Sequence, residues 1–512
     1  MFDNIKYLHI LVFVQMIERG QMIEKIKHKG LALAVLAAAQ FMVILDATIV
    51  NVALPAIRSS LGFTSDAQLQ WVVTAYALAF GGFLLLGGRL ADLFGRRKLF
   101  LIGVVVFALA SLLAGVAQNP EQIIIFRTLQ GLGGALLAPA ALSLVLSIFK
   151  EGPERNKALG VWSMVAAGGG AVGLILGGVL TQYVDWRWIF FINVPIAIAI
   201  IAATYAYVPV AKPQEKQRVD LLGALTITGS LMSLVYALAQ AADNGWGSTN
   251  TLVAFAAFAV LMAAFIINEL KIRQPLIRLD IFKRRNVTGG SLVMLFMPAA
   301  MFGMFFYLSI YLQQVLGYSP TMTGIANLPF TLMILLVAGV LSRNITKVNT
   351  KAILVGAPLL VALSLLFFAR VPVAANYWTD ILPGILLMAG AMATIFVTAT
   401  LVTTSGVSHQ ESGLVSGILN TGQQIGGAIG LAVLTVVSTA ATRTQMATIQ
   451  DPSQAVNAVV YGFHQGFEVA ALFAVAASVV AFTVLKVRKP TQQDLAQEAE
   501  TEAEALPAIP GA

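Results

Sequence analysis

The sequence contains no cysteine and few histidines, and each shortage removes a class of function. With no cysteine among 512 residues, disulfide bonds, thiol nucleophiles and cysteine-ligated metals are excluded. The four histidines, His9, His28, His409 and His464, are too scattered for the ligand spacing of a metal site. The phosphate-binding pattern G-x-x-x-x-G-K-[S/T] is missing, so ATP is not the direct energy source. We therefore expect no metal and no cofactor.

Charged residues are also scarce. Only 11% of residues are charged and 58% are hydrophobic, whereas a soluble protein is about a quarter charged. This composition indicates a membrane protein that crosses the lipid bilayer many times. The net charge of +8 does not indicate nucleic-acid binding, because the basic residues fall between the apolar segments.

Fourteen segments are long and apolar enough to cross a membrane, which takes about 20 residues each. The expected fold class is therefore an all-α polytopic membrane protein with fourteen transmembrane helices. The segments cover residues 31–56, 69–88, 99–118, 122–147, 158–181, 187–208, 220–241, 250–269, 287–313, 320–342, 351–370, 378–402, 413–436 and 465–486.

The distribution of basic residues sets the expected orientation in the membrane. If the N-terminus is cytoplasmic, 27 of the 32 lysines and arginines fall in cytoplasmic segments. The outer loops hold four, Arg58, Arg187, Arg370 and Arg443, and Arg127 lies within a span. Because lysine and arginine accumulate in cytoplasmic loops, we expect both termini in the cytoplasm and location in the cytoplasmic (inner) membrane.

The two ends of the chain differ from the rest. Residues 1–30 carry no convincing cleavable signal peptide and are expected to form a cytoplasmic extension, with Met22 as an alternative start to Met1. Residues 487–512 are polar and acidic, so they are expected to form a disordered cytoplasmic tail.

A weak internal repeat divides the spans into two halves. Glycine-rich runs at Ala166–Leu180 and Thr421–Gly430 coincide if two spans are treated as an insertion. The expected domains are a six-helix bundle at 31–208, a linker with two extra spans at 209–286, and a second six-helix bundle at 287–486. Paired bundles of this kind hold a substrate site between them, near the middle of the membrane.

Asp46 lies in the middle of the first span. A charged carboxylate at bilayer depth costs about 2.5–3.5 kcal/mol on insertion scales, and burial favours its neutral form. Asp46 is therefore a candidate proton carrier, or a counter-ion for a cationic ligand. A purely structural pairing with a neighbouring helix remains a second interpretation.

Arg127 lies near the start of the fourth span, and Gln130 follows one helical turn later. A guanidinium group stays charged in a protein, so it must find water, a carbonyl oxygen or a carboxylate. A role in proton transfer and a snorkelling position at the outer interface both remain open for Arg127.

The loop Gly87–Lys98, GGRLADLFGRRK, combines three glycines with four basic residues and Asp92. From Gly88 to Lys98 it resembles the G-x-L-A-D-x-x-G-R-R-K signature of the major facilitator superfamily. The resemblance implies that Asp92 and Arg96, with Gly88, Gly95 and Arg97, form a cytoplasmic gating loop. A simple positively charged turn is the alternative.

Two further motifs resemble the fourteen-span drug:proton antiporter branch of this superfamily, the EmrB/QacA type. They are L-D-x-T-I-V-N-V-A-L-P at Leu45–Pro55 and R-x-x-Q-G-x-G-G at Arg127–Gly134. The resemblance implies that Asp46 takes part in proton coupling and drug recognition, and Arg127 in proton transfer.

The fifth span resembles the antiporter motif G-x-x-x-G-P-x-x-G-G. Gly169, Gly173, Gly177 and Gly178 match it, but Leu174 stands where proline is usual. Glycines every four residues form a groove for close helix packing. The resemblance implies an ion-tight seal, and Leu174 leaves the bend of this helix in doubt.

Neutral polar residues within the spans are candidate contacts in a substrate cavity, with hydrogen bonding between helices as the alternative. They are Gln130, Asn327, Asn420, Gln423 and Gln424. Some members of the branch carry a second acid in the tenth span, associated with divalent cations. The tenth span here has Asn327 and no acid, so dicationic drugs are disfavoured as substrates.

The resulting hypothesis is a proton-coupled antiporter that exports amphipathic or lipophilic compounds, cationic ones in particular, by alternating access. Its expected partners are small molecules, protons and the bilayer, with no nucleic acid, and a periplasmic adaptor if the cell has two membranes. Export of an endogenous metabolite, peptide or lipid is the alternative within transport. A non-transporting sensor or scaffold is a remote one. An enzyme is not expected, because the spans hold no nucleophile elbow or metal cluster.

Overall fold

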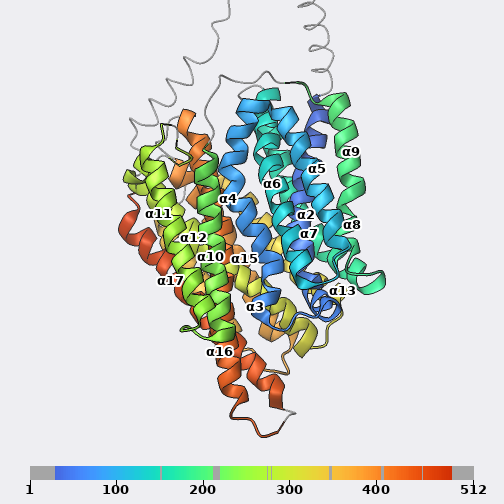
Figure 1. Ribbon diagram of the computed structural model, residues 1–512, viewed down its shortest axis with the longest axis vertical. Helices are drawn as coiled ribbons and strands as arrows, with labels where there is room; N and C mark the ends of the chain where they lie inside the picture. Colours follow the sequence, from blue (N-terminus) through green and yellow to red (C-terminus); the bar gives the residue numbers. More distant parts are fainter. Residues whose placement is uncertain are drawn as a thin grey trace, which may run out of the picture.

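The computed structural model describes residues 29–149, 153–210, 220–273, 275–277, 279–344, 349–404, 409–451 and 454–486. Within these ranges every regular element is a helix, and most helices run side by side along the long axis of the molecule (Figure 1). The predicted all-α class is therefore confirmed.

The helices follow the predicted spans closely. The first bundle contains α2 (Lys29–Leu61), α3 (Asp66–Leu69), α4 (Trp71–Phe94), α5 (Arg96–Gly115), α6 (Pro120–Ile148), α7 (Pro153–Tyr183), α8 (Trp188–Phe191) and α9 (Asn193–Tyr207). Two inserted helices follow, α10 (Leu221–Asn244) and α11 (Thr249–Lys271). The second bundle contains α12 (Arg285–Ile310), α13 (Pro320–Asn344), α14 (Thr350–Phe368), α15 (Leu382–Thr404), α16 (His409–Met446) and α17 (Ala455–Val484).

Thirteen helices in the described ranges are long and apolar enough to cross a membrane. The remaining predicted span, the fifth at 158–181, coincides with α7, a 31-residue helix in which several side chains lie outside the described residues. The helix packs along α2 and α13.

Several helix ends are fixed by local sequence signals. Asn119 caps α6 by accepting a hydrogen bond from the Gln122 backbone, and Pro120 occupies the first helical position, where its missing N–H has no cost. Gly95 separates α4 from α5 with a φ of +92°, a backbone conformation open mainly to glycine. We call this side of the molecule the Gly95 end, and the opposite side, where α7 meets α8, the Trp186 end.

Some boundaries differ from the prediction. The predicted span 187–208 is split into α8 and α9, and the span predicted at 465–486 starts earlier, at Ala455. The predicted span 413–436 extends to Met446, so α16 and α17 project beyond the other helices at the bottom of Figure 1. Hydropathy marks the stretch that fits the membrane, and it does not detect a helix that continues into water.

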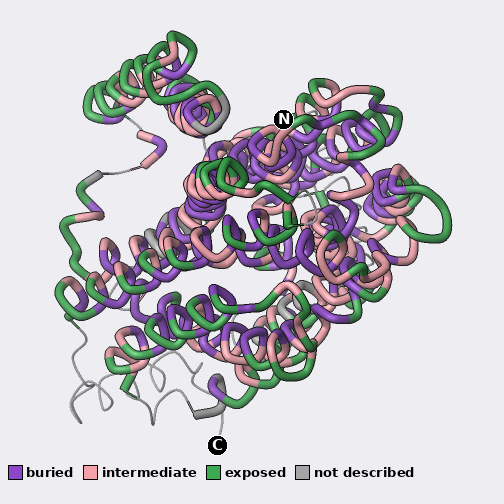
Figure 2. The backbone as a smooth tube through the Cα atoms, turned by 90° about the horizontal axis from the view of Figure 1, so that it is seen from below, coloured by how far each residue is buried: buried purple, intermediate pink, exposed green. Residues whose placement is uncertain are grey.

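The two bundles meet along two helix pairs, α4 with α16 and α7 with α13. At the Trp186 end, Gln313 donates a hydrogen bond to the Val52 carbonyl at 2.9 Å, and the Thr321 backbone donates to Gln182 at 3.2 Å. Buried residues face neighbouring helices, and exposed ones cover the outer sides (Figure 2). Only 17% of the most apolar stretch of α11 is buried, so this helix lies on the periphery of the molecule.

Candidate functional site

A buried ion pair joins the first and fourth spans. Arg127 on α6 donates from Nη1 to Oδ2 of Asp46 on α2 at 2.6 Å. The two side chains are 1% and 0% exposed, so water does not screen the pair in this conformation. The interfacial snorkelling alternative for Arg127 is therefore wrong for this conformation.

Two amides complete the hydrogen bonding of the carboxylate. Gln130 donates to Oδ1 of Asp46 at 2.7 Å, and Asn193 donates to the same oxygen at 2.9 Å. The Gln130 side-chain oxygen in turn accepts a bond from Arg127 at 2.8 Å. Both carboxylate oxygens thus accept hydrogen bonds, from three donors in all.

Two aromatic rings lie close to the guanidinium group of Arg127. Its central carbon is 4.3 Å from the ring centre of Tyr76 and 5.8 Å from that of Phe190. Its Nε donates to the Val72 carbonyl at 2.9 Å. The buried cation therefore has aromatic partners and a carbonyl partner in addition to the carboxylate. Together these contacts hold it in one position.

Glycines in α6 allow the neighbouring helices α4 and α5 to pack close against it. A side chain at Gly131 would collide with the Tyr76 carbonyl oxygen on α4, and one at Gly133 would lie 2.5 Å from the Phe107 nitrogen on α5. The R-x-x-Q-G-x-G-G motif therefore supplies both the polar groups and the small residues that let α4 and α5 pack around them.

Two buried polar atoms of the site have no hydrogen-bond partner in the described part of the chain. They are the Tyr76 hydroxyl and Oδ1 of Asn193. Asn193 also donates to Ser111 Oγ at 3.0 Å, and Ser111 donates to the Phe190 carbonyl at 2.8 Å. The polar network thus extends from α2 through α9 to α5.

The glycine motif of α7 faces α2, as a packing groove requires. A methyl group at Gly177 would lie 2.6 Å from the Ile49 carbonyl oxygen, and one at Gly173 would lie 2.9 Å from that of Leu45. At Gly178 it would lie 2.5 Å from Thr321 Cα at the start of α13. Gly169 has more room, because a methyl group there would be 3.3 Å from the nearest atoms of Phe41. The helix runs unbroken past Leu174.

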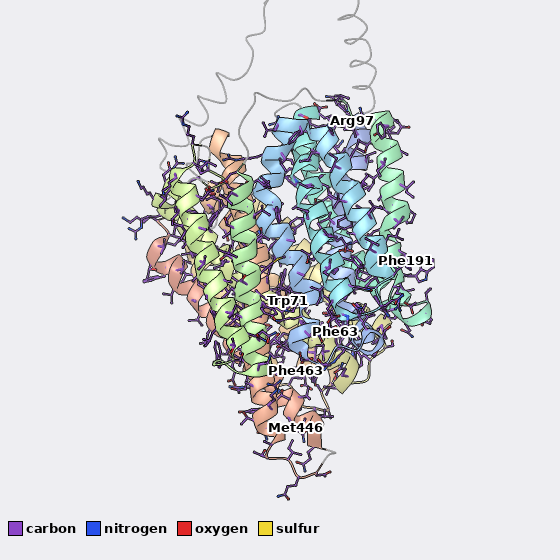
Figure 3. The ribbon with its side chains drawn as sticks, in the orientation of Figure 1. Phe63, Trp71, Arg97, Phe191, Met446 and Phe463 are labelled. Atoms are coloured by element: carbon purple, nitrogen blue, oxygen red, sulfur yellow. The ribbon has the colours of Figure 1, made fainter. Side chains whose placement is uncertain are left out.

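The predicted gating loop lies at the Gly95 end, where Figure 3 labels Arg97. Arg97 donates to the Tyr205 carbonyl at 3.2 Å, and Arg96 donates to that of Ser143 at 3.4 Å. Gly88 lies in the last turns of α4, where an added methyl group would be 3.9 Å from Pro139 Cβ. The Asp92 side chain lies outside the described residues, so its role with Arg96 in the gating loop stays a prediction.

The five candidate cavity residues have different surroundings in the structure. Gln130 belongs to the Asp46 network, whereas Asn327 is 1% exposed and donates to the Thr323 carbonyl of its own helix. On α16, Asn420 is exposed and also bonds within its helix. Gln423 and Gln424 are half-buried, and Gln424 faces Gly81 of α4. A single binding cavity formed by this set stays a prediction.

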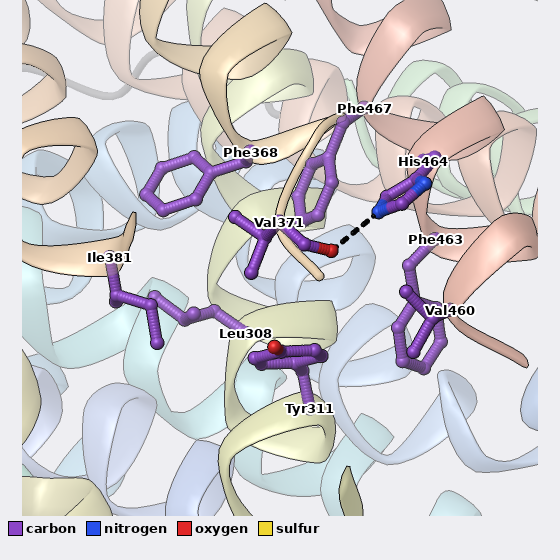
Figure 4. A pocket seen from close by; sticks show the side chains of 9 residues that line it. All are labelled: Leu308, Tyr311, Phe368, Val371, Ile381, Val460, Phe463, His464 and Phe467. Atoms are coloured by element: carbon purple, nitrogen blue, oxygen red, sulfur yellow. Dashed lines mark hydrogen bonds between the residues drawn. The ribbon is translucent and has the colours of Figure 1, made fainter. Parts of the chain in front are cut away.

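A small apolar pocket lies elsewhere, inside the second bundle toward the Trp186 end. His464 lines it and bonds to the Val371 carbonyl at 2.9 Å (Figure 4). The other lining residues are Leu308, Tyr311, Phe368, Ile381, Val460, Phe463 and Phe467. The lining is mostly apolar, and the His464 ring nitrogen that faces Val371 is already hydrogen-bonded. We therefore assign this pocket to the core of the second bundle.

Sequence reasoning missed several members of the site. One of them is Asn193, which lies at the start of α9. Just before it in the chain, Trp186 is 4% exposed and packs against Phe190, and Arg187 stacks on the Trp186 ring at 4.4 Å. An asparagine just inside a span was the available signal, because an amide buried in a membrane needs a partner.

Comparisons with known proteins agree with this architecture. A family model described as the Major Facilitator Superfamily matches residues 36–431. The puromycin resistance protein pur8 of Streptomyces alboniger is 40% identical over 447 residues, which cover 86% of this chain and 88% of that protein. The cephamycin export protein CmcT of Amycolatopsis lactamdurans is 37% identical over 416 residues, 80% and 85% of the two chains.

Solved structures share the fold at low sequence identity. An auto-inhibited peptide transporter of the POT family has a TM-score of 0.64 at 15% identity, with 91% of this chain and 98% of that chain covered. A bacterial homologue of the human lysosomal transporter Spinster, in an inward-facing and unoccupied conformation, has a TM-score of 0.63 at 18% identity, with 89% and 96% covered. The fold, the family model and relatives at 40% and 37% identity show that the chain belongs to the major facilitator superfamily and is a multi-pass membrane transporter rather than an enzyme.

Proposed function

We propose that this transporter exports amphipathic drug-like compounds, antibiotics among them, in exchange for protons, and that Asp46 accepts the proton. The substrate class rests on relatives named for resistance to or export of puromycin, cephamycin, tetracenomycin C and lincomycin. The coupling role rests on one observation, the carboxylate of Asp46 paired at 2.6 Å with Arg127 at full burial.

Protonation of this carboxylate changes the balance of the whole network. The ionised acid offers two oxygens to three donors, from Arg127, Gln130 and Asn193. The neutral acid cannot balance the buried guanidinium charge, so the ion pair weakens and α2 is released from α6. A contact that is closed with the ionised acid and open with the neutral acid shifts the equilibrium between the two orientations of the bundles. Alternating access requires such a shift.

The proton gradient supplies the energy in this proposal, with no cofactor. Each charge that crosses the membrane gains about 2.3 kcal/mol per 100 mV, about the size of a 50-fold concentration ratio. We place the Gly95 end in the cytoplasm of the cell, with both termini there and the protein in the cytoplasmic membrane, because the basic loops lie at that end. A periplasmic adaptor belongs to this proposal only in a cell with two membranes.

The test is efflux from proteoliposomes with an imposed pH gradient, using a compound selected in an efflux-deficient bacterial host. Asp46→Asn is expected to abolish gradient-driven efflux, and Asp185→Asn, a change at an exposed acid between α7 and α8, is expected to retain it. Undiminished gradient-driven efflux by Asp46→Asn rejects the coupling role. Competition by cell metabolites but not by antibiotics favours an exporter of an endogenous compound.

A further inference from the structure

The two inserted helices end in a polar cluster that the proposed transport mechanism does not use. Asp220 is 1% exposed and caps α10, with its Oδ1 accepting a bond from the Gly223 backbone at 2.7 Å. Asn268 at the end of α11 donates to both oxygens of Asp220 at 2.8 Å. The start of α10 and the end of α11 are thereby tied together at the Gly95 end.

A second buried acid, Glu269, joins this cluster to the segment that follows. Glu269 is 5% exposed. Its carboxylate accepts backbone hydrogen bonds from Leu276 at 3.3 Å and Ile277 at 3.0 Å. A methyl group at Gly223 would be 2.8 Å from Oε1 of Glu269 and closer still to Oδ2 of Asp220, so the two acids meet over the first turn of α10.

Arg89 of the first bundle reaches the same place. It extends from the end of α4, donates a hydrogen bond to the Pro275 carbonyl, and lies within electrostatic range of Glu269 and Asp220. Two carboxylates this close repel each other unless a cation or a proton intervenes. Arg89 is the cation that the described structure places there.

We call residues 275–277 and 279–283 the connector, and it touches both bundles. Leu276 is 1% exposed and is buried in a cluster with Leu86 of α4 and Ala224 of α10. Ile281 is 4% exposed and is buried in another cluster with Val287 of α12 and with α16. Ile277 packs against both clusters. The connector therefore spans the junction of α4 and α16.

A segment docked on both bundles resists their relative motion. We propose that the connector is a strap that holds α4 and α16 together at the Gly95 end, that Glu269 and Arg89 are its positioning residues, and that its Leu276 contact with α4 must open in each transport cycle. The contact with the second bundle stays closed, because Ile281 precedes the start of α12 by only a few residues. The opening of the Leu276 contact in each cycle rests on the proposed transport function.

Reversible cross-linking tests the opening step, because the natural chain has no cysteine. A short, reducible thiol cross-linker is applied to Leu86→Cys/Leu276→Cys in proteoliposomes, with Ile281→Cys/Val415→Cys as the matched pair within the second bundle. We expect the first cross-link to stop efflux until reductant is added, and the second to leave efflux unchanged. Efflux through the cross-linked first pair, or no cross-linking of that pair, overturns the proposal.

A second measurement is independent of any substrate. Spin labels at Phe94→Cys and Lys283→Cys, both exposed positions, report the distance between the end of α4 and the end of the connector. Glu269→Gln is expected to lengthen or broaden this distance, whereas Glu468→Gln, an exposed acid on α17, is expected to leave it unchanged. An unchanged distance in folded Glu269→Gln contradicts the strap even if no exported compound is ever found.

Discussion

The buried pair of Asp46 and Arg127 makes a prediction about stability that depends on which partner is removed. Asp46→Asn leaves a guanidinium group at 1% exposure without its carboxylate. Both oxygens of Asp46 face donors, so the amide must turn its own NH₂ toward one of them. Breaking a buried pair from one side costs about 3–5 kcal/mol, and a guanidinium cannot escape that cost by losing its proton.

Removing the arginine has a different consequence. In Arg127→Gln the remaining acid can take up a proton and become neutral, so its penalty shrinks as the pH falls. We therefore expect Arg127→Gln to gain stability relative to wild type between pH 8 and pH 5, and Asp46→Asn to gain much less. The double variant, which has no buried charge at either position, is expected to lose less than the sum of the two single losses.

The measurement is denaturant unfolding in mixed micelles at both pH values, followed by circular dichroism. A coupling between the two substitutions of several kcal/mol supports an energetically important ion pair. Additive losses, or a pH response of Asp46→Asn equal to that of Arg127→Gln, refute the reasoning.

Three further predictions concern helix packing, backbone conformation and the hydrogen bonds of the site. Gly173→Ala should push α7 away from α2 and cost about 1–3 kcal/mol in unfolding experiments, while Gly168→Ala, with no atom within 4 Å of the added methyl, should cost much less. Gly95→Ala should cost about 1–3 kcal/mol, because φ is +92° there, whereas Gly88→Ala should be nearly neutral in the same assay. Asn193→Leu removes a donor to the carboxylate and should cost about 1–3 kcal/mol, with reduced proton-driven efflux in vesicles; full stability and full efflux would show that this amide is dispensable.

The sequence predicted the all-α class and the order of the spans because apolar length is a direct requirement of the bilayer; thirteen of the fourteen predicted spans meet that requirement in the described ranges. It also singled out Asp46, Arg127 and Gln130, since polar groups at membrane depth are costly unless they have partners. Which of them meet depends on the rotation and tilt of α2 against α6, which are set by packing and not by hydropathy. Their direct contact therefore had to come from the structure.

The surroundings of the other polar residues also depend on packing. Asn327 and Asn420 were grouped with Gln130 as cavity candidates because all three are polar residues within spans. In the structure Asn327 and Asn420 donate hydrogen bonds to carbonyls of their own helices. The positions of polar residues in the sequence do not reveal this use of an amide. The role of Glu269 was hidden because its partners are backbone groups seven and eight residues further along the chain.

The most direct test of the central claim is whether substrate binding displaces a proton from Asp46. Purified protein in weakly buffered detergent solution is mixed with an exported compound, and proton release is followed with a pH indicator dye. Wild type and Asp185→Asn are expected to release protons on binding, and Asp46→Asn is expected to bind without release. Equal proton release by Asp46→Asn and wild type would show that another group carries the proton.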